Sequence, residues 1–427
     1  MPMLASTFLT DSLMTLVLAL LVAKALAVLG LEWINRRHVR RHPTRPPAFA
    51  KVMSPATYRK AVAYTLADSR FHSIATAWGA LVLAVVLLGG VAPRLYEVSG
   101  RWLGHSLWAD ALYLLAVLWL ISLPSLPLAW WEQFRLEQRF GFNRSTQALW
   151  WTDRLKGLVL SLLLLFPLVV LLLWLVEVAG PLWWLWGFLA LFLFQLLMAV
   201  VYPAWIMPWF NKFTPLPEGD LRSRLMNLAD RTGFKAQTIL VMDGSRRSAH
   251  ANAFFAGFGR LRRIVLYDTL VEQLKPEQLE AVLAHEIGHS RLGHIPRLLA
   301  AGGAAMLLGF AVLGWLAGQP WFLAGLGFAT DPAPATLAPT LLMVVLLSGL
   351  VSFWAGPLMS ILSRRYEYQA DEFARRAVGA ARPLVESLRV LSRKNLSNLT
   401  PHPLYSAFYY SHPTLLEREQ ALMRAEG

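Results

Sequence analysis

Long apolar segments alternate along this chain with short basic ones. A bilayer core about 30 Å thick is spanned by roughly 20 apolar residues in helical conformation. The sequence contains seven segments of this kind that are nearly free of charge, and each is predicted to be a transmembrane helix. They are Leu13–Leu31, Ile74–Val91, Ala111–Trp130, Leu158–Val176, Leu182–Met207, Leu298–Gly318 and Leu337–Leu362.

The basic residues fall on alternate loops between these segments. Of the 40 Lys and Arg residues, 37 lie after the first, third, fifth and seventh segments, two lie after the second, and Lys24 lies within the first. The positive-inside rule therefore places the N-terminus outside and the C-terminus inside. Residues 1–12 carry no Lys or Arg, so the first segment is expected to be a retained anchor and not a cleaved signal peptide.

This pattern divides the chain into four portions. Two of them are polar, follow an odd-numbered segment, and are therefore expected on the inner side. The four portions are residues 1–207, with five transmembrane helices and the inner loops 32–73 and 131–157, the polar residues 208–297, residues 298–362 with helices six and seven, and the polar residues 363–427.

Composition supports a membrane protein and limits its chemistry. The chain is 56% hydrophobic and 15% charged, whereas soluble domains are about 45–50% apolar and about 25% charged. The net charge of +14 is explained by membrane topology, so no nucleic-acid partner is expected. Because the chain has no Cys, it can have no disulfide, thiolate ligand or Cys nucleophile, and any metal must be held by His and carboxylate groups.

The first inner portion carries a metal-binding pattern on a predicted helix. Thr238–Val241 and Arg263–Tyr267 are typical of β-strands, and Pro276 follows Lys275 at the start of a helix. That helix reaches His285-Glu286-Ile287-Gly288-His289, which is the pattern H-E-x-x-H. Residues four apart share a helix face, so both imidazoles can bind one zinc ion while Glu286 serves as general base.

A hydrolytic zinc site needs a third protein ligand and an open position. The metzincin pattern fails because Leu292 and Ile295 stand where it requires Gly and His, and His294 is interpreted as a helix-end residue at the membrane interface. Residues 287–366 contain a single acidic group, Asp331, which the charge pattern places on the outer side. The next candidates are Glu367, Asp371 and Glu372. Glu367 and Asp371 are four apart, so one can bind zinc while the other holds a ligand histidine, whereas Glu372 points elsewhere.

These residues belong to a set of segments that resembles the CAAX prenyl protease 1 family over most of the chain. The family consists of integral-membrane zinc metalloproteases with two His ligands and one Glu ligand. The segments that carry the resemblance are Glu137–Asn143, Pro203, Asn211–Pro215, Gly244–Phe254, Arg263–Leu270, the His285 motif, the Glu367 segment, Tyr410–Pro413, and Glu417 with Arg418.

The resemblance implies a fold and a set of roles. The expected fold is an all-α polytopic membrane protein in which seven helices enclose a chamber, with a small α/β metalloprotease portion on the cytosolic side. His285, His289 and Glu367 would bind one Zn²⁺ per chain, Glu286 would activate water, and Asp371 would orient a ligand histidine. His412 would stabilise the oxyanion, with Arg418 close behind it. Asn252, Ala253 and Phe254 belong to the segment Asn252–Gly257, which would bind an extended peptide by strand addition.

Three readings of the function remain open from sequence alone. The first is a zinc metalloendopeptidase that cleaves CAAX-type or other membrane-associated peptides, lipidated or not. The second keeps this chemistry in a quality-control protease without prenyl specificity, because the chain resembles a compact form from a bacterial inner membrane. The third is a seven-span transporter or receptor with an incidental H-E-x-x-H, although no internal repeat supports it.

Overall fold

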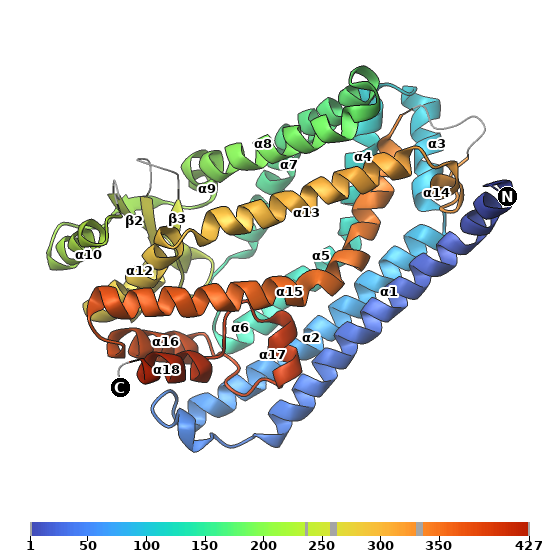
Figure 1. Ribbon diagram of the computed structural model, residues 1–427. Helices are drawn as coiled ribbons and strands as arrows, with labels where there is room; N and C mark the ends of the chain where they lie inside the picture. Colours follow the sequence, from blue (N-terminus) through green and yellow to red (C-terminus); the bar gives the residue numbers. More distant parts are fainter. Residues whose placement is uncertain (1, 235–237, 257–262, 330–335, 426–427) are drawn as a thin grey trace.

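The computed structural model describes residues 2–234, 238–256, 263–329 and 336–425. Within these ranges seven helical spans are long and apolar enough to cross a bilayer, which confirms the predicted all-α polytopic class (Figure 1). Five of the spans extend well beyond their apolar segments at one end or both, whereas the fifth and sixth agree with them to within four residues. The spans are Leu9–Arg41, Pro55–Leu88, Leu107–Phe140, Gln147–Val178, Gly180–Phe210, His294–Ala317 and Ala338–Val378.

Two of these helices carry polar residues far past the apolar boundary. Helix α1 (Pro2–Arg41) continues beyond Leu31, and α15 (Ala338–Val378) continues beyond Leu362. Arg, Glu, Gln and Ala, which fill these extensions, are good helix formers, so nothing in the local sequence ends either helix at the apolar boundary. The division expected between residues 362 and 363 therefore falls inside one continuous helix.

The third and fifth spans are irregular helices. Each passes through a π-helical turn near its end, η3 (Glu132–Glu137) and η5 (Tyr202–Ile206). Pro203 lies within η5, and Pro124 lies in the short 3₁₀ turn η2 (Leu123–Ser125). Proline has no N–H to donate, so it disturbs the regular ladder of hydrogen bonds in both spans.

Most residues of the membrane-spanning segments are not buried within the protein. In the most apolar window of each span only 6% to 28% of the residues are buried. On α2 (Pro55–Leu88), Ile74 and Leu81 are exposed on one face, while Thr76 and Gly79 on the opposite face line a cavity of about 380 Å³ that Lys24 also lines. One face of such a helix therefore meets the bilayer and the other faces a hollow interior.

A small four-stranded sheet lies at the polar end of the molecule, in the order β1-β2-β4-β3. Strand β1 (Phe213–Pro215) is antiparallel to β2 (Thr238–Met242), β2 is parallel to β4 (Arg263–Tyr267), and β3 (Ala253–Ala256) is antiparallel to β4. The two strands predicted from the sequence are confirmed as β2 and β4. Asn252 directly precedes β3, and Gly257 lies outside the described residues.

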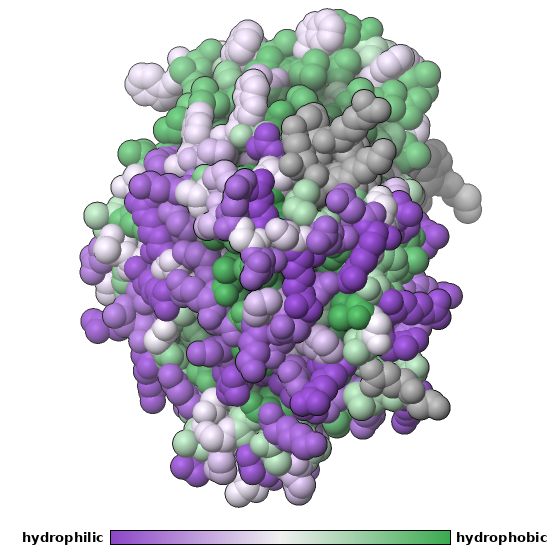
Figure 2. All heavy atoms as spheres, turned by 90° about the vertical axis from the view of Figure 1, so that its left-hand side faces the viewer, coloured by the Kyte–Doolittle hydropathy of each residue, from purple (hydrophilic) through white to green (hydrophobic). Residues whose placement is uncertain are grey.

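The core of the polar end joins this sheet to α12 (Pro276–Arg291) and to the end of α15. Ile264 and Leu266 of β4, Leu283 of α12 and Ala374 of α15 are all buried in one apolar cluster. Side chains on the surface at this end are largely hydrophilic (Figure 2). The remaining helices are α3 (Val91–Leu103), α4 (Leu107–Ser122), α5 (Leu126–Trp131), α6 (Gln138–Phe140), α7 (Gln147–Val178), α8 (Trp183–Val201), α9 (Met207–Phe210), α10 (Asp220–Arg231), α11 (Asp268–Gln273), α13 (His294–Ala317), α14 (Pro320–Ala324), α16 (Arg382–Lys394), α17 (Pro403–Tyr409) and α18 (Leu415–Arg424).

Candidate metal centre

Three potential metal ligands meet where α12 packs against α15. His285 and His289 lie one turn apart on α12, and Glu367 lies on α15, 3% exposed. His285 Nε2 is 3.2 Å from His289 Nε2 and 3.4 Å from Glu367 Oε2, and His289 Nε2 is 3.2 Å from Glu367 Oε1. The family resemblance predicted these three residues as the ligands, and the fold brings them together.

The spacing of these atoms suits a zinc-like ion. Tetrahedral ligands at about 2.0–2.2 Å from zinc stand about 3.3–3.6 Å apart. The two imidazole nitrogens are 3.2 Å apart, and each lies 3.2 to 3.4 Å from one of the two oxygens of the Glu367 carboxylate, which is close to that spacing. Because Glu367 provides an anionic oxygen and both histidines turn a ring nitrogen toward it, the donor set can hold a divalent cation with a position left open.

The next residue of the motif, Glu286, lies beside this group and is not a member of it. Its carboxyl interacts electrostatically with His285, His289, Glu367 and His412. Burial raises the pKa of Glu286, and the neighbouring imidazoles oppose that rise. A carboxyl whose pKa is raised toward neutrality is a better general base than an ordinary surface glutamate.

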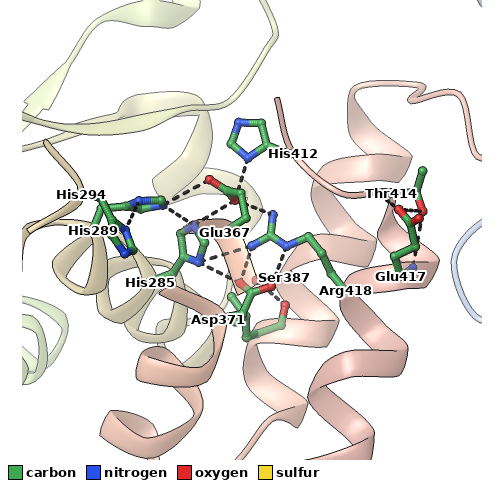
Figure 3. Close-up of polar contacts among 11 residues, drawn as sticks. His285, His289, His294, Glu367, Asp371, Ser387, His412, Thr414, Glu417 and Arg418 are labelled. Atoms are coloured by element: carbon green, nitrogen blue, oxygen red, sulfur yellow. Dashed lines mark hydrogen bonds and ion pairs between the residues drawn. The ribbon is translucent and has the colours of Figure 1, made fainter. Parts of the chain in front are cut away.

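A buried carboxylate and an arginine hold the first histidine. Asp371 Oδ1 lies 2.8 Å from His285 Nδ1, the ring nitrogen remote from Glu367. Arg418 of α18 donates to both oxygens of Asp371, at 2.8 and 2.5 Å, and its NH1 lies 3.5 Å from Glu367 Oε2 (Figure 3). Asp371 thus fixes the ring orientation that turns Nε2 toward the centre. Glu372 pairs instead with Arg375 and Arg376, away from the site.

The glycine of the motif serves helix packing. A Cβ at Gly288 would lie 3.1 Å from Ala370 Cα and 3.2 Å from Phe373 Cβ. The backbone of α15 lies so close to Gly288 that a larger residue would push α15, and Glu367 with it, away from the histidines. Glycine at this position therefore allows α12 and α15 to pack closely.

The second histidine has a support that the sequence did not reveal. His294, fully buried at the start of α13, places Nδ1 3.0 Å from His289 Nδ1 and Nε2 2.9 Å from Gln369 Oε1. The amide oxygen can only accept, so Nε2 of His294 carries a proton and its Nδ1 accepts from Nδ1–H of His289. That tautomer leaves Nε2 of His289 with a free lone pair for a metal ion. His294 is at a helix end, as expected, and it also orients a ligand.

We expect His294→Phe to weaken metal binding by about 10- to 100-fold, the usual cost of losing a partner of a ligand histidine. Phenylalanine retains the stacking on Tyr366, whose ring centroid is 4.3 Å from that of His294, but cannot accept the proton of His289. Metal affinity is measured by competition with a chelator of known affinity. Tyr366→Phe, which keeps the stacking, is the matched control, and an unchanged affinity in His294→Phe would exclude this support.

His412 reaches the same centre from the C-terminal portion. Its Nδ1 is 2.7 Å from Glu367 Oε2, and its side chain is 62% exposed (Figure 3). An exposed imidazole beside the ligands is accessible to a substrate carbonyl. Sequence reasoning found His412 and Arg418 only through the family resemblance.

The segment before β3 is fixed against the end of the third span, the turn that follows it and the start of the fourth span. Ala249 N donates to Phe142 O, and the Arg247 guanidinium pairs with Asp153 at 2.8 Å. The ring of His250 stacks on Phe142 and lies 3.5 Å from Glu137, whose carboxylate raises the pKa of His250. β3 is therefore held at one end, and among the described strands it is at an edge of the sheet, against α12.

Two family models together match almost the whole chain. The model described as CAAX prenyl protease N-terminal, five membrane helices, matches residues 35–212. The model for peptidase family M48 matches residues 215–426, which include every candidate ligand.

Similar proteins are known from plants and fungi. A CAAX prenyl protease 1 homolog from Arabidopsis thaliana is 36% identical, over 89% of this chain and 90% of its own. CAAX prenyl protease 1 from Saccharomyces cerevisiae is 34% identical over 88% of each chain. The crystal structure of S. mikatae Ste24p superposes with a TM-score of 0.88 at 32% identity, covering 96% of this chain and 98% of the other.

Proposed function

The chain belongs to the CAAX prenyl protease 1 family and is a multi-pass membrane metallopeptidase, and from this premise we propose that it is a zinc endopeptidase whose centre is His285, His289 and Glu367. The observation that carries the proposal is the close approach of one imidazole nitrogen from each histidine to the Glu367 carboxylate and to each other, beside the Glu286 carboxyl. Family membership argues against the transporter or receptor reading.

Zinc fits the donor set better than other common ions. Two imidazoles and one carboxylate are a usual set for hydrolytic zinc, whereas Ca²⁺ and Mg²⁺ prefer oxygen ligands alone. One zinc ion per chain, when bound, would act as a Lewis acid and lower the pKa of water at the site.

The protein's own groups supply proton transfer and charge stabilisation. Glu286 would accept a proton from the attacking water and pass it to the amine that leaves. His412 would donate to the oxyanion that develops on the peptide carbonyl, and preorganised donors of this kind stabilise that charge strongly. Asp371, with Arg418 behind it, would keep His285 in the tautomer that binds metal.

An extended peptide would bind along β3. An edge strand offers unpaired backbone groups, and a peptide can add to it as a further strand. Asn252, Ala253 and Phe254 begin that edge. Because β3 lies against α12, a peptide added there would run past the centre.

The substrate is a peptide or protein, and we propose a CAAX-type or other membrane-associated one. The printed names of the relatives favour CAAX processing, and the hollow among the membrane helices suits a lipidated or otherwise apolar segment. Quality control of membrane proteins without prenyl specificity is the second candidate. A peptide that binds by strand addition is held through its backbone hydrogen bonds, so many sequences can be accepted.

A single assay with the purified full-length enzyme separates these substrates. Rates are measured for a farnesylated CAAX peptide, the same peptide without farnesyl, and an unfolded membrane protein. CAAX specificity predicts that farnesylation raises kcat/KM by at least about tenfold, which is 1.4 kcal/mol of transition-state binding. Equal rates on all three favour the quality-control function, and no zinc-dependent cleavage of any of them would overturn both.

We further propose that the N-terminus faces outside and that the metal centre faces the cytoplasm. The charge asymmetry between alternate loops supports this orientation. The relatives named above are eukaryotic, so the bacterial inner membrane predicted from the sequence stays a prediction.

Because the chain has no Cys, single cysteines can report its orientation without background labelling. We expect Arg101→Cys, in an outer loop, to react with a membrane-impermeant maleimide in intact cells. Lys51→Cys, in an inner loop, should react only after the cells are permeabilised. The opposite pattern would mean that the orientation is inverted.

A further inference from the structure

Helix α17 packs on α15 through the rings of Phe408 and Phe353, and one arginine of α15 also binds its backbone. The last carbonyls of any helix lack partners within the helix. NH1 of Arg364, on α15, lies 3.2 Å from Ser406 O, 3.1 Å from Ala407 O and 2.9 Å from Tyr410 O. The guanidinium donates to Ala407 O and Tyr410 O, adds to the bond that Ser406 O already accepts from Tyr410 N, and complements the negative end of the helix dipole.

A second side chain on the same face of α15 strengthens this attachment. Ser360, four residues before Arg364, donates its hydroxyl to Phe408 O at 3.3 Å. Glu367 follows Arg364 by three residues and lies on the same side of the helix. One stretch of α15 therefore holds both a metal ligand and the end of α17.

The chain that leaves α17 leads directly to His412. The His412 side chain is largely exposed, and its ion-pair partner, Glu367 Oε2, belongs to a proposed metal ligand. When Glu367 Oε2 binds the metal, it is less able to hold the imidazole of His412. The position of the imidazole then depends on the position of the His412 backbone. On the far side, Thr414 caps α18, which Arg418 ties to Asp371. On the near side, Phe408 packs on Phe353 and Tyr405 contacts Glu32, and Arg364 is the side chain that binds the carbonyl of Tyr410, two residues before His412.

We propose that Arg364 is a positioning residue for catalysis, which fixes the end of α17 so that His412 meets the substrate oxyanion. This inference rests on the proposed role of His412. Arg364 acts through the backbone and does not touch the substrate. A guanidinium that merely stabilised α17 would affect thermal stability, but not the turnover of the folded, zinc-loaded enzyme.

Steady-state kinetics of the zinc-loaded full-length enzyme test this role. We expect Arg364→Met to lower kcat by about 10- to 100-fold, since a displacement of about 1 Å at a catalytic group can cost 10²-fold. KM and zinc content should stay within twofold. Arg364→Lys, which retains a cation at the carbonyls, should recover part of kcat and also serves if Arg364→Met folds poorly. The exposed neighbour substitution Arg365→Met is the matched control, with wild-type kcat expected.

A double-mutant cycle shows whether the effect passes through His412. In a His412→Ala background, Arg364→Met should cause no further loss, because the group that it positions is gone. Additive losses would overturn the inference, as would wild-type kcat in Arg364→Met. If zinc-dependent hydrolysis persists but His412→Ala keeps wild-type kcat, the inference fails while the zinc peptidase assignment stands.

Amide hydrogen exchange gives a readout that does not depend on activity. The backbone amide of Tyr410, which donates to Ser406 O at 3.0 Å, should exchange faster in Arg364→Met than in Arg365→Met, because the end of α17 is released. Equal exchange in the two variants would also overturn the inference. A wild-type enzyme without zinc-dependent cleavage would instead contradict the proposed function, and the exchange experiment would still decide whether Arg364 holds this segment.

Discussion

Replacing Glu286 by Gln is expected to lower kcat by about 10²- to 10⁴-fold, the range attributed to a general acid–base group. Glutamine has nearly the same shape and helix propensity, so α12 should fold unchanged. Glu286 is adjacent to the three ligand atoms without being one of them, so zinc content should stay at one per chain. The two measurements are single-turnover hydrolysis and metal analysis of the same purified sample.

The control for this substitution is Glu277→Gln, the same chemical change in the first turn of α12. Glu277 is exposed and meets Arg224 at 3.5 Å, an ion pair whose loss costs at most about 1 kcal/mol. The kcat of the Glu277→Gln enzyme should equal that of the wild type. A Glu286→Gln enzyme that retained wild-type turnover would remove Glu286 from the mechanism, and one that lost zinc would mean that Glu286 acts on the metal.

The membrane fold could be predicted because its cause is local. Each span needs an apolar stretch of set length, and each loop carries its own charge, so both can be read without tertiary structure. The ends of the helices could not be predicted in this way. α15 continues to Val378 because its polar extension packs against α12, and the apolar boundary at Leu362 gives no sign of that contact.

The metal ligands were predictable for a different reason. The spacing of His285 and His289 defines a helix face, and the scarcity of acidic residues after His289 made Glu367 and Asp371 the first suitably spaced carboxylates on the inner side. The family resemblance then assigned Glu367 as the ligand. The supports of these ligands depend on tertiary contacts between distant segments. Neither the approach of Gln369 to His294 nor that of Arg364 to α17 follows from spacing along the chain.

Replacing Glu367 by Gln is expected to remove zinc from the protein at concentrations at which the wild type holds one ion per chain. The change deletes the only anionic ligand, so affinity should fall by more than the roughly 10- to 100-fold expected for an outer partner such as His294. Hydrolysis should disappear together with the metal. Titration with zinc against a chelator, followed by assay of the loaded sample, separates loss of affinity from loss of chemistry.

Glu372→Gln makes the same exchange on the same helix, but at a residue that pairs with Arg375 and Arg376 away from the centre. The Glu372→Gln enzyme should keep both zinc and activity. It therefore shows whether the loss of any carboxylate from α15 affects the enzyme, apart from the loss of the ligand Glu367. If Glu367→Gln bound zinc as tightly as the wild type, the third ligand would have to be another residue. Among the described residues, His412 and Asp371 would then be the groups to substitute next, because both lie within hydrogen-bonding distance of the proposed ligand set.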